Sequence, residues 1–277
     1  MMQTLEQEVA DHYTHGDLER AILAGLRALG RDADDIRPED LAAIDEFHIG
    51  GQSATDELAA QLDLKPGTTL LDLGSGLGGP ARLFARQYGC SVIGLDLTPE
   101  YVLVAARLTE LVGLQDRAEF RVGSALELPF AGSSFDRATL LHVGMNIPDK
   151  ERLCREVYRV LKPGGLFGVY DVMRTGEEEI EFPVPWAATK ATSFAETPQR
   201  YREALESAGF EVISERDRRE TGAEFFRQMK ARIAASGPPP LGLHVLMGQD
   251  APIKTGNMLR NLEAGCIAPV EMIACRS

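Results

Sequence analysis

The sequence contains few cysteines and no long hydrophobic run. Its four cysteines (Cys90, Cys154, Cys266 and Cys275) are widely separated, and no pair has the C-x-x-C spacing of a metal or redox site. No window of about 18 uncharged apolar residues occurs, so no transmembrane helix is expected. The first residues also lack the basic-then-apolar pattern of a secretory signal. These absences predict a cytoplasmic protein with reduced thiols and no metal site.

Basic residues are outnumbered by acidic ones. The 29 Lys and Arg residues against 42 Asp and Glu residues give a net charge of −13. Such a charge repels nucleic acids at long range, so no nucleic-acid partner is expected, and no membrane partner either. A content of 44% hydrophobic residues is typical of a globular chain, and we expect a monomer or homodimer. The acidic charge suits a neutral or cationic small molecule as the ligand.

A glycine-rich turn between residues 69 and 80 is the stretch around which the rest of the sequence is arranged. An apolar run ends in the carboxylate of Asp72, the glycines follow, and Pro80 begins a helix. A second apolar run then ends in the carboxylate of Asp96. This order of strand, turn, helix, strand and acid predicts the start of a parallel sheet that binds a nucleotide or nucleoside.

The same turn allows two kinds of ligand. Gly74, Gly76 and Gly79 satisfy G-x-G-x-x-G, the pattern that holds the pyrophosphate of a dinucleotide on a helix N-terminus. Asp72 lies two residues before the first glycine and would repel a phosphate. S-adenosylmethionine (SAM) has no phosphate, and its sulfonium and ammonium groups would be attracted by the acid. The charges favour SAM over a nicotinamide or flavin dinucleotide, and a turn that merely connects two elements is the third interpretation.

Residues 71–76 (Leu-Asp-Leu-Gly-Ser-Gly) resemble the first motif of the class I SAM-dependent methyltransferases. The resemblance implies that the acid and the glycine turn hold the methionine part of SAM, that Asp96 binds the ribose, and that Leu97 covers the adenine. In that family an acid that binds the adenine amino group often follows the glycine after the third strand, and Ser124 stands there instead. The cofactor residues so implied are Asp72, Gly74, Ser75, Gly76, Asp96, Leu97, Ser124, Ala125 and Leu141.

The rest of the chain alternates strands and helices. Residues 1–64 are expected to form a helical N-terminal cap, and residues 65–277 the SAM-binding domain, with lid segments near 174–197 and 221–265. Regular alternation predicts an α/β fold with a doubly wound, mostly parallel, seven-stranded sheet, which is the Rossmann-like methyltransferase fold. The expected strands cover residues 69–73, 91–96, 118–122, 135–143, 166–172, 210–215 and 269–275.

Two histidines are candidate catalytic residues. His142 ends the fourth strand, where it would lie beside the transferred methyl group, although a histidine that only caps a strand is an equal alternative. His48 precedes two adjacent glycines at a break between helices, where the backbone can approach the cofactor closely. A surface histidine in an interhelical loop is the alternative. Either side chain would act as a general base toward the methyl acceptor.

Three further segments resemble one branch of the family, the sarcosine/dimethylglycine N-methyltransferases. They are Phe-His-Ile-Gly-Gly from Phe47, His-Val-Gly-Met-Asn-Ile-Pro-Asp-Lys from His142, and Pro-Val-Pro-Trp-Ala ending at residue 187. The resemblance implies a small-molecule acceptor, most often an amine nitrogen, with Phe47 and Met145 near it. Trp186, the single tryptophan, would face a cationic amine as part of an aromatic box, and a core or loop anchor is the alternative.

One departure from that branch bears on the acceptor. Leu140 and Leu141 precede His142 where polar residues are common in the branch, so the acceptor pocket is expected to be more apolar. Methyl transfer to carbon or oxygen of an apolar acceptor therefore stays open as an alternative, and so does a non-catalytic SAM-binding protein.

Overall fold

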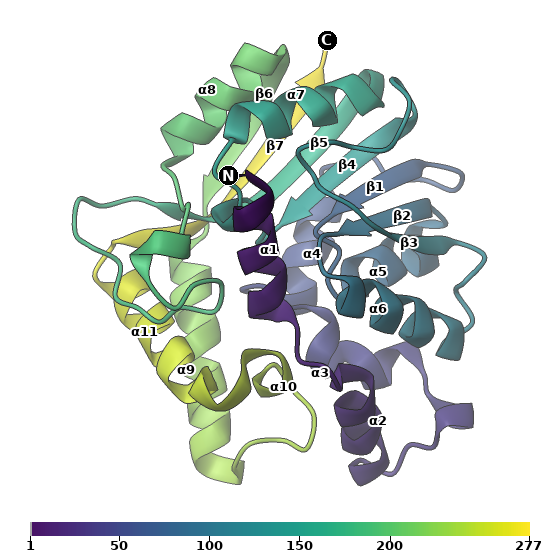
Figure 1. The fold of residues 1–277 in the computed structure, drawn as a ribbon, viewed down its shortest axis with the longest axis vertical. Coiled ribbons are helices and arrows are strands. Elements are labelled where there is room, and N and C mark those ends of the chain that lie inside the picture. The colour runs from purple at the N-terminus through teal and green to yellow at the C-terminus, as the bar shows by residue number, and fades with distance from the viewer. Residues whose placement is uncertain (1) are drawn as a thin grey trace.

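A seven-stranded sheet with the strand order β3-β2-β1-β4-β5-β7-β6 forms the centre of the protein (Figure 1). The fold comes from a computed structural model that describes residues 2–277. Strand β7 runs antiparallel to β5 and β6, and the other pairs are parallel, so the expected Rossmann-like methyltransferase fold is confirmed. The strands are β1 (Thr69–Leu73), β2 (Ser91–Asp96), β3 (Ala118–Val122), β4 (Phe135–Leu141), β5 (Leu161–Arg174), β6 (Phe210–Asp217) and β7 (Ile267–Arg276).

Helices cover both faces of the sheet, and further helices lie below the carboxyl ends of its strands in Figure 1. Several of them begin with a proline in the first turn, where the missing N–H costs no hydrogen bond, and the Asp149 side chain caps α7 by accepting from Arg152 N. The helices are α1 (Met2–Tyr13), α2 (Leu18–Ala28), α3 (Ala42–Asp45), α4 (Gly51–Ala59), α5 (Gly79–Tyr88), α6 (Pro99–Leu111), α7 (Lys150–Val160), α8 (Pro198–Ala208), α9 (Arg219–Ser236), α10 (His244–Met247) and α11 (Ala251–Glu263). None of the helices in residues 2–277 is long and apolar enough to cross a membrane.

Some element boundaries differ from the expected ones. Strand β5 begins at Leu161 rather than at residue 166, because Leu161 already pairs with Phe135 of β4. The register then shifts, and regular pairing resumes at Leu166, which lies opposite Arg137. Helix α9 begins at Arg219 rather than at residue 223, and α11 at Ala251 rather than at residue 256. Both helices thus extend through residues of low helix propensity, Thr221 and Gly222 in α9 and Thr255 in α11.

Alternate side chains of β1 point to opposite faces of the sheet, as the pleat of a strand requires. Leu70 lies in a core cluster with Phe84 of α5, whereas Leu71 lies in the cluster that contains Leu153 of α7 and Tyr201 of α8. The first strand is thus buried on both sides. Its carboxyl end is held in place from both faces, and this end carries Asp72 and the glycine turn.

The segment that precedes β1, which is the predicted N-terminal cap, is connected to α5 by a buried ion pair. The Arg82 guanidinium donates to Asp45 Oδ1 of α3 at 2.6 Å and to Thr109 Oγ1 of α6 at 2.9 Å. The backbones also meet closely, because a Cβ built on Gly79 would lie 1.9 Å from the Asp45 carbonyl oxygen. This junction sets the position of the segment that follows Asp45, which includes His48.

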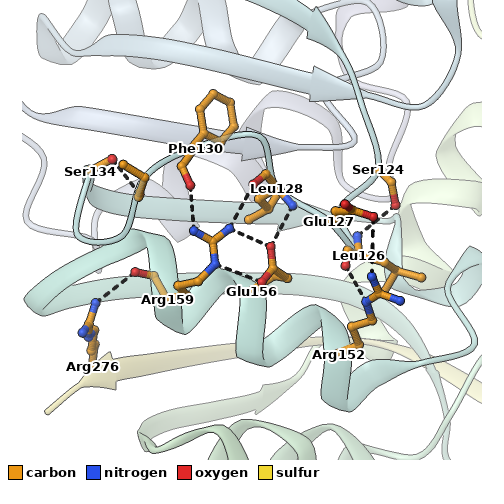
Figure 2. A network of polar contacts seen from close by, with 11 residues as sticks. Ser124, Leu126, Glu127, Leu128, Phe130, Ser134, Arg152, Glu156, Arg159 and Arg276 are labelled. Carbon is orange, nitrogen blue, oxygen red and sulfur yellow. Dashed lines mark hydrogen bonds and ion pairs between the residues drawn. The ribbon is translucent and has the colours of Figure 1, made fainter.

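A second polar network holds the loop between β3 and β4 against α7 (Figure 2). Arg159 donates to the carbonyl oxygens of Phe130 and Leu128 at 2.7 and 2.9 Å. Arg152 donates to the Leu126 carbonyl oxygen at 2.7 Å, and Glu156 accepts from Leu128 N. Two arginines of one helix therefore hold the loop that begins at residue 123.

Gly79→Ala tests the junction between cap and sheet. The added Cβ would meet backbone rather than a flexible side chain, so we expect a loss of about 1–3 kcal/mol in the free energy of unfolding, measured by urea denaturation. Gly256→Ala in α11 is the matched control, because its Cβ would meet only the end of the Arg260 side chain at 3.4 Å. The control variant should be unchanged or slightly more stable. Equal stability of both variants would contradict this packing.

Candidate functional site

A cavity lies at the carboxyl ends of β1, β2, β3 and β4, with an empty volume of about 1180 Å³ that includes its open mouth. This is where ligands bind in open α/β sheets. No Lys or Arg side chain is among the residues that line it within the described chain. The structure brings together here all nine residues predicted for the cofactor, namely Asp72, Gly74, Ser75, Gly76, Asp96, Leu97, Ser124, Ala125 and Leu141.

Asp96 at the end of β2 is held by backbone donors. Its Oδ2 accepts from Gly76 N at 2.9 Å, and its Oδ1 accepts from Thr98 N at 2.9 Å. Burial raises the pKa of the carboxyl, and these hydrogen bonds act in the opposite direction. Each oxygen keeps a further acceptor site, so the carboxylate is able to accept both hydroxyls of a ribose.

The turn after β1 needs glycine at two positions for different reasons. Gly74 has φ +67°, and a Cβ there would lie 2.3 Å from the Val143 side chain. Gly76 has φ +52°, and a Cβ there would meet nothing within 4 Å, because the residue faces the cavity. The first glycine lets the turn pack against the end of β4, and the second leaves its surface open to a ligand.

Buried polar atoms without a partner line this cavity, and they fit a cationic nucleoside. Asp72 Oδ1 accepts from Thr139 Oγ1 at 2.8 Å, but Asp72 Oδ2 and the hydroxyls of Ser75 and Tyr101 have no hydrogen-bond partner among the residues that the structure describes. Burial raises the pKa of Asp72 to about 7, with a smaller contribution from Glu46. An ammonium group at Asp72 would satisfy the free oxygen and favour the charged carboxylate, whereas a diphosphate would add a third buried negative charge beside Asp72 and Asp96.

His48 is buried in a polar cluster from the cap. Its Nε2 lies 2.7 Å from Glu46 Oε2 and 3.0 Å from Thr55 Oγ1, and Thr55 Oγ1 donates to the same carboxylate at 2.8 Å. Within residues 2–277, the hydrogen-bond contact of Nδ1 is with the Ile49 carbonyl oxygen, at 3.3 Å. With Nε2–H donating to Glu46, Nδ1 is the nitrogen that remains to take a proton.

His142 adopts φ +55° at the end of β4, where its ring is already engaged by the protein. Its Nδ1–H donates to the Tyr170 carbonyl oxygen at 3.1 Å, and its Nε2 accepts from Ile49 N at 3.3 Å. Burial, together with the charge of nearby His48, lowers the pKa of His142 well below its usual value. The imidazole is therefore neutral, and it holds the segment that carries His48.

A second cavity adjoins the first where both are lined by Tyr13, Phe47, His48 and His142. It has an empty volume of about 520 Å³, which includes its open mouth. Phe47, Met145 and Trp186, the residues predicted for the acceptor, all line it, and the Trp186 ring is held by a hydrogen bond to Ser193 Oγ. Aromatic, aliphatic and thioether side chains form most of its wall, including four methionines, Met145, Met229, Met247 and Met258.

Several lining residues were missed at the sequence level. Leu5, Val9 and Tyr13 recur at helical spacing, and all three line the cavity, while Tyr13 also packs against a core cluster. Glu6, on the same helix, is not part of any motif. Two phenylalanines and three methionines of the second cavity lie between residues 225 and 258, within a predicted lid, and no spacing rule singles them out. No group of three or more His, Cys, Asp or Glu side chains in the described residues is arranged to hold a metal.

The methyltransferase domain model matches residues 71–169. The chain is 30% identical to methyltransferase GfsG of Streptomyces halstedii over 217 residues, which cover 77% of this chain and 76% of that protein. It is 30% identical to 24-methylenesterol C-methyltransferase 2 of Arabidopsis thaliana over 80% of this chain and 67% of that protein. A sterol 24-C-methyltransferase of Yarrowia lipolytica is 31% identical, but the match spans only 44% of that protein.

Solved structures share the fold at lower identity. Geranyl diphosphate C-methyltransferase from Streptomyces coelicolor A3(2), in complex with S-adenosyl-L-homocysteine, superposes with a TM-score of 0.71 at 17% identity, over 99% of this chain and 98% of that one. A protein assigned as a sarcosine dimethylglycine methyltransferase from Galdieria sulphuraria gives 0.69 at 22% identity, over 81% and 86%. The family match and the neighbours solved with this cofactor or its product agree with SAM as the cofactor.

Asp96→Ala tests the ribose contact. Loss of a charged acceptor should weaken binding of S-adenosylhomocysteine by about ten- to a hundredfold in isothermal titration calorimetry. Asp116→Ala, on an exposed loop outside the cavity, is the control and should bind as the wild type does. Unchanged binding by Asp96→Ala would remove this residue from the site.

The pH dependence of binding tests Asp72. Its pKa of about 7 means that below pH 7 the carboxyl must lose a proton before it pairs with an ammonium group. Affinity for S-adenosylhomocysteine should therefore fall by up to about tenfold per pH unit below pH 7 and level off above it. Asp72→Asn should bind weakly, without this slope. A slope that persists in Asp72→Asn would assign it to another group, such as Asp45, whose pKa is raised by burial to about 6.

Proposed function

The chain belongs to the class I SAM-dependent methyltransferases, and from this premise we propose that it transfers the methyl group of SAM to an uncharged, largely apolar small molecule. The observation that carries the proposal is the second cavity, which adjoins the cofactor cavity at the two histidines. Among the described residues that line it there is no Asp, Glu, Lys or Arg. A zwitterionic or phosphorylated acceptor would have no charged side chain to pair with there, whereas an apolar one would bury its surface against the wall.

Bound SAM supplies a methyl group activated by a positively charged sulfur. The chain contributes position and charge: Asp96 accepts the ribose hydroxyls, Asp72 pairs with the ammonium group, and the open face of Gly76 admits the methionine part. Leu97, Ala125 and Leu141 supply apolar contacts around the nucleoside. The main contributions to catalysis are then the alignment of the methyl group with the acceptor atom and the exclusion of water.

His48 is the proposed general base. Glu46 and Thr55 fix its ring, and the carboxylate stabilises the imidazolium that forms when Nδ1 takes a proton. His142 is a positioning residue in this proposal, because its Nε2 lone pair already accepts from Ile49 N. His48 Nδ1 instead faces a carbonyl oxygen, which would accept a hydrogen bond from Nδ1 once that nitrogen is protonated. This proposal narrows the expectation that either histidine acts as the base.

Carbon is the acceptor atom that we propose. When a neutral alkene carbon takes the methyl group, the acceptor becomes a carbocation, which the nearby aromatic rings of Phe47, Phe225 and Trp186 would stabilise. Loss of a proton from the adjacent carbon to His48 then restores a neutral alkene. The names of several relatives specify C-methylation, of sterols in two of the proteins compared above. The expectation of an amine nitrogen stays a prediction, which rests on sequence resemblance and on structural neighbours of low identity whose names specify amine substrates.

The two predicted lid segments both contribute to the second cavity. Pro185 and Trp186 come from residues 174–197, and Phe225, Phe226 and Met229 from residues 221–265. We propose that these segments and the cap of residues 1–64 close over the acceptor, as lids that exclude water do in other enzymes. Flexible thioethers would let the wall adapt to the shape of the acceptor.

An acceptor panel tests the proposed function. Release of S-adenosylhomocysteine would be measured with a sterol that has a side-chain alkene, a prenyl alcohol and a prenylated hydroquinone, and in parallel with sarcosine, dimethylglycine and phosphoethanolamine. We expect turnover in the apolar group, with the new methyl located on carbon by NMR. Faster turnover of the amines would contradict the proposal and support the amine branch.

His48→Gln tests the base once an acceptor is found. We expect kcat to fall by about 10²–10⁴-fold with little change in cofactor affinity, because the base acts on the acceptor and not on SAM. Glu46→Gln should cause a smaller loss of the same kind, and the two losses should not add in the double variant. If His48→Gln keeps the wild-type kcat, His48 is not the base and has only a structural role.

A further inference from the structure

We propose that Glu6 of α1 accepts a hydrogen bond from the amino group of the adenine, so that the N-terminal helix recognises the nucleobase and closes over it. The inference uses the adenine position proposed above, near Leu97 and Ser124. It concerns the cofactor end of the site and is independent of which acceptor is methylated.

Helix α1 forms one wall of the cofactor cavity. Leu5, Val9 and Tyr13 line it together with Glu6, all on one face of the helix (Figure 1 shows α1 lying across the carboxyl edge of the sheet). Tyr13 Oη also lies 3.5 Å from Asn146 Oδ1, beyond the end of β4. A nucleoside bound on Asp96 would therefore lie beneath this helix.

Hydrogen-bonding groups are scarce where the adenine would lie. Beyond β3, Gly123, Ser124, Ala125 and Leu126 line the cavity, and Ser124 alone has a polar side chain. Its hydroxyl accepts from Leu126 N at 3.0 Å and donates to Glu6 Oε1. The serine proton is thus already used, and the acceptor capacity of the Glu6 carboxylate remains.

An adenine amino group is a donor of two hydrogen bonds and needs an acceptor. A carboxylate is the strongest acceptor that a side chain offers, and Glu6 is half-buried, so water competes with it only in part. The same carboxylate would repel the carbonyl oxygen of a hypoxanthine base. Glu6 should therefore select the amino purine over the oxo purine.

The attachment of α1 explains why such a contact would close the helix. Glu100 at the start of α6 accepts from three backbone N–H groups, those of His15, Gly16 and Leu18, at 2.5 to 3.0 Å. The carboxyl end of α1 is fixed there, and Glu6 lies two turns away, toward the other end. The other end is held by the hydrogen bond from Ser124 Oγ to Glu6, and contact between the base and Glu6 would strengthen this attachment.

The test compares two ligands in calorimetry: S-adenosylhomocysteine and S-inosylhomocysteine, in which an oxo group replaces the amino group. The wild type should prefer the adenosyl compound by about ten- to a hundredfold. In Glu6→Gln the side-chain amide can donate to the oxo group, so the preference should fall to near unity or reverse. Glu8→Gln, an exposed position on the same helix, is the matched control and should keep the wild-type preference.

The ratio of the two affinities distinguishes recognition of the base by Glu6 from a role of Glu6 that is limited to holding α1 in place. If Glu6 only anchors α1 to Ser124, Glu6→Gln would change both affinities alike and leave the preference at its wild-type value, which would overturn the proposal. Hydrogen exchange gives a second readout: the adenosyl ligand should protect α1 amides in the wild type and in Glu8→Gln, and protect them less in Glu6→Gln. Equal protection in all three proteins would likewise contradict closure by Glu6.

Discussion

Two buried carboxylates at the ends of neighbouring strands are the constraint on which the rest of the site depends. Asp72 ends the apolar part of β1 and Asp96 ends β2, and the glycine turn between them brings the Gly76 N–H to the second acid. The structure does not neutralise them with arginine or lysine within the described cavity. The unpaired charge makes the cavity poor for a diphosphate and good for a nucleoside that carries cations.

The two histidines lie where the cofactor cavity meets an apolar one, and we propose different roles for them, positioning for His142 and proton acceptance for His48. His142 uses both nitrogens to connect β4, β5 and the cap, while His48 keeps one nitrogen with only a long contact. The chemistry thus depends on the segment after α3, whose position is set by the ion pair between Asp45 and Arg82. Packing between cap and sheet is in this way connected to catalysis.

The local pattern of residues 69–96 sufficed to predict the central strands and the cofactor residues, because the chain itself brings the ends of adjacent parallel strands together. The same rule placed Ser124 and His142 at the site. Glu6, Met229, Met247 and Met258 could not be predicted, since they reach the two cavities only through tertiary packing of segments far apart in sequence. In the sequence, Leu140 and Leu141 were the residues that indicated an apolar acceptor cavity.

The central claim is that charge at the turn selects a phosphate-free, cationic nucleoside. The most direct measurement is a pair of calorimetric titrations of the wild-type protein at one pH and salt concentration, one with SAM and one with NADH. The account predicts saturable binding of SAM at a single site and no detectable heat of binding with NADH. Saturable binding of NADH, or the absence of SAM binding, would contradict it.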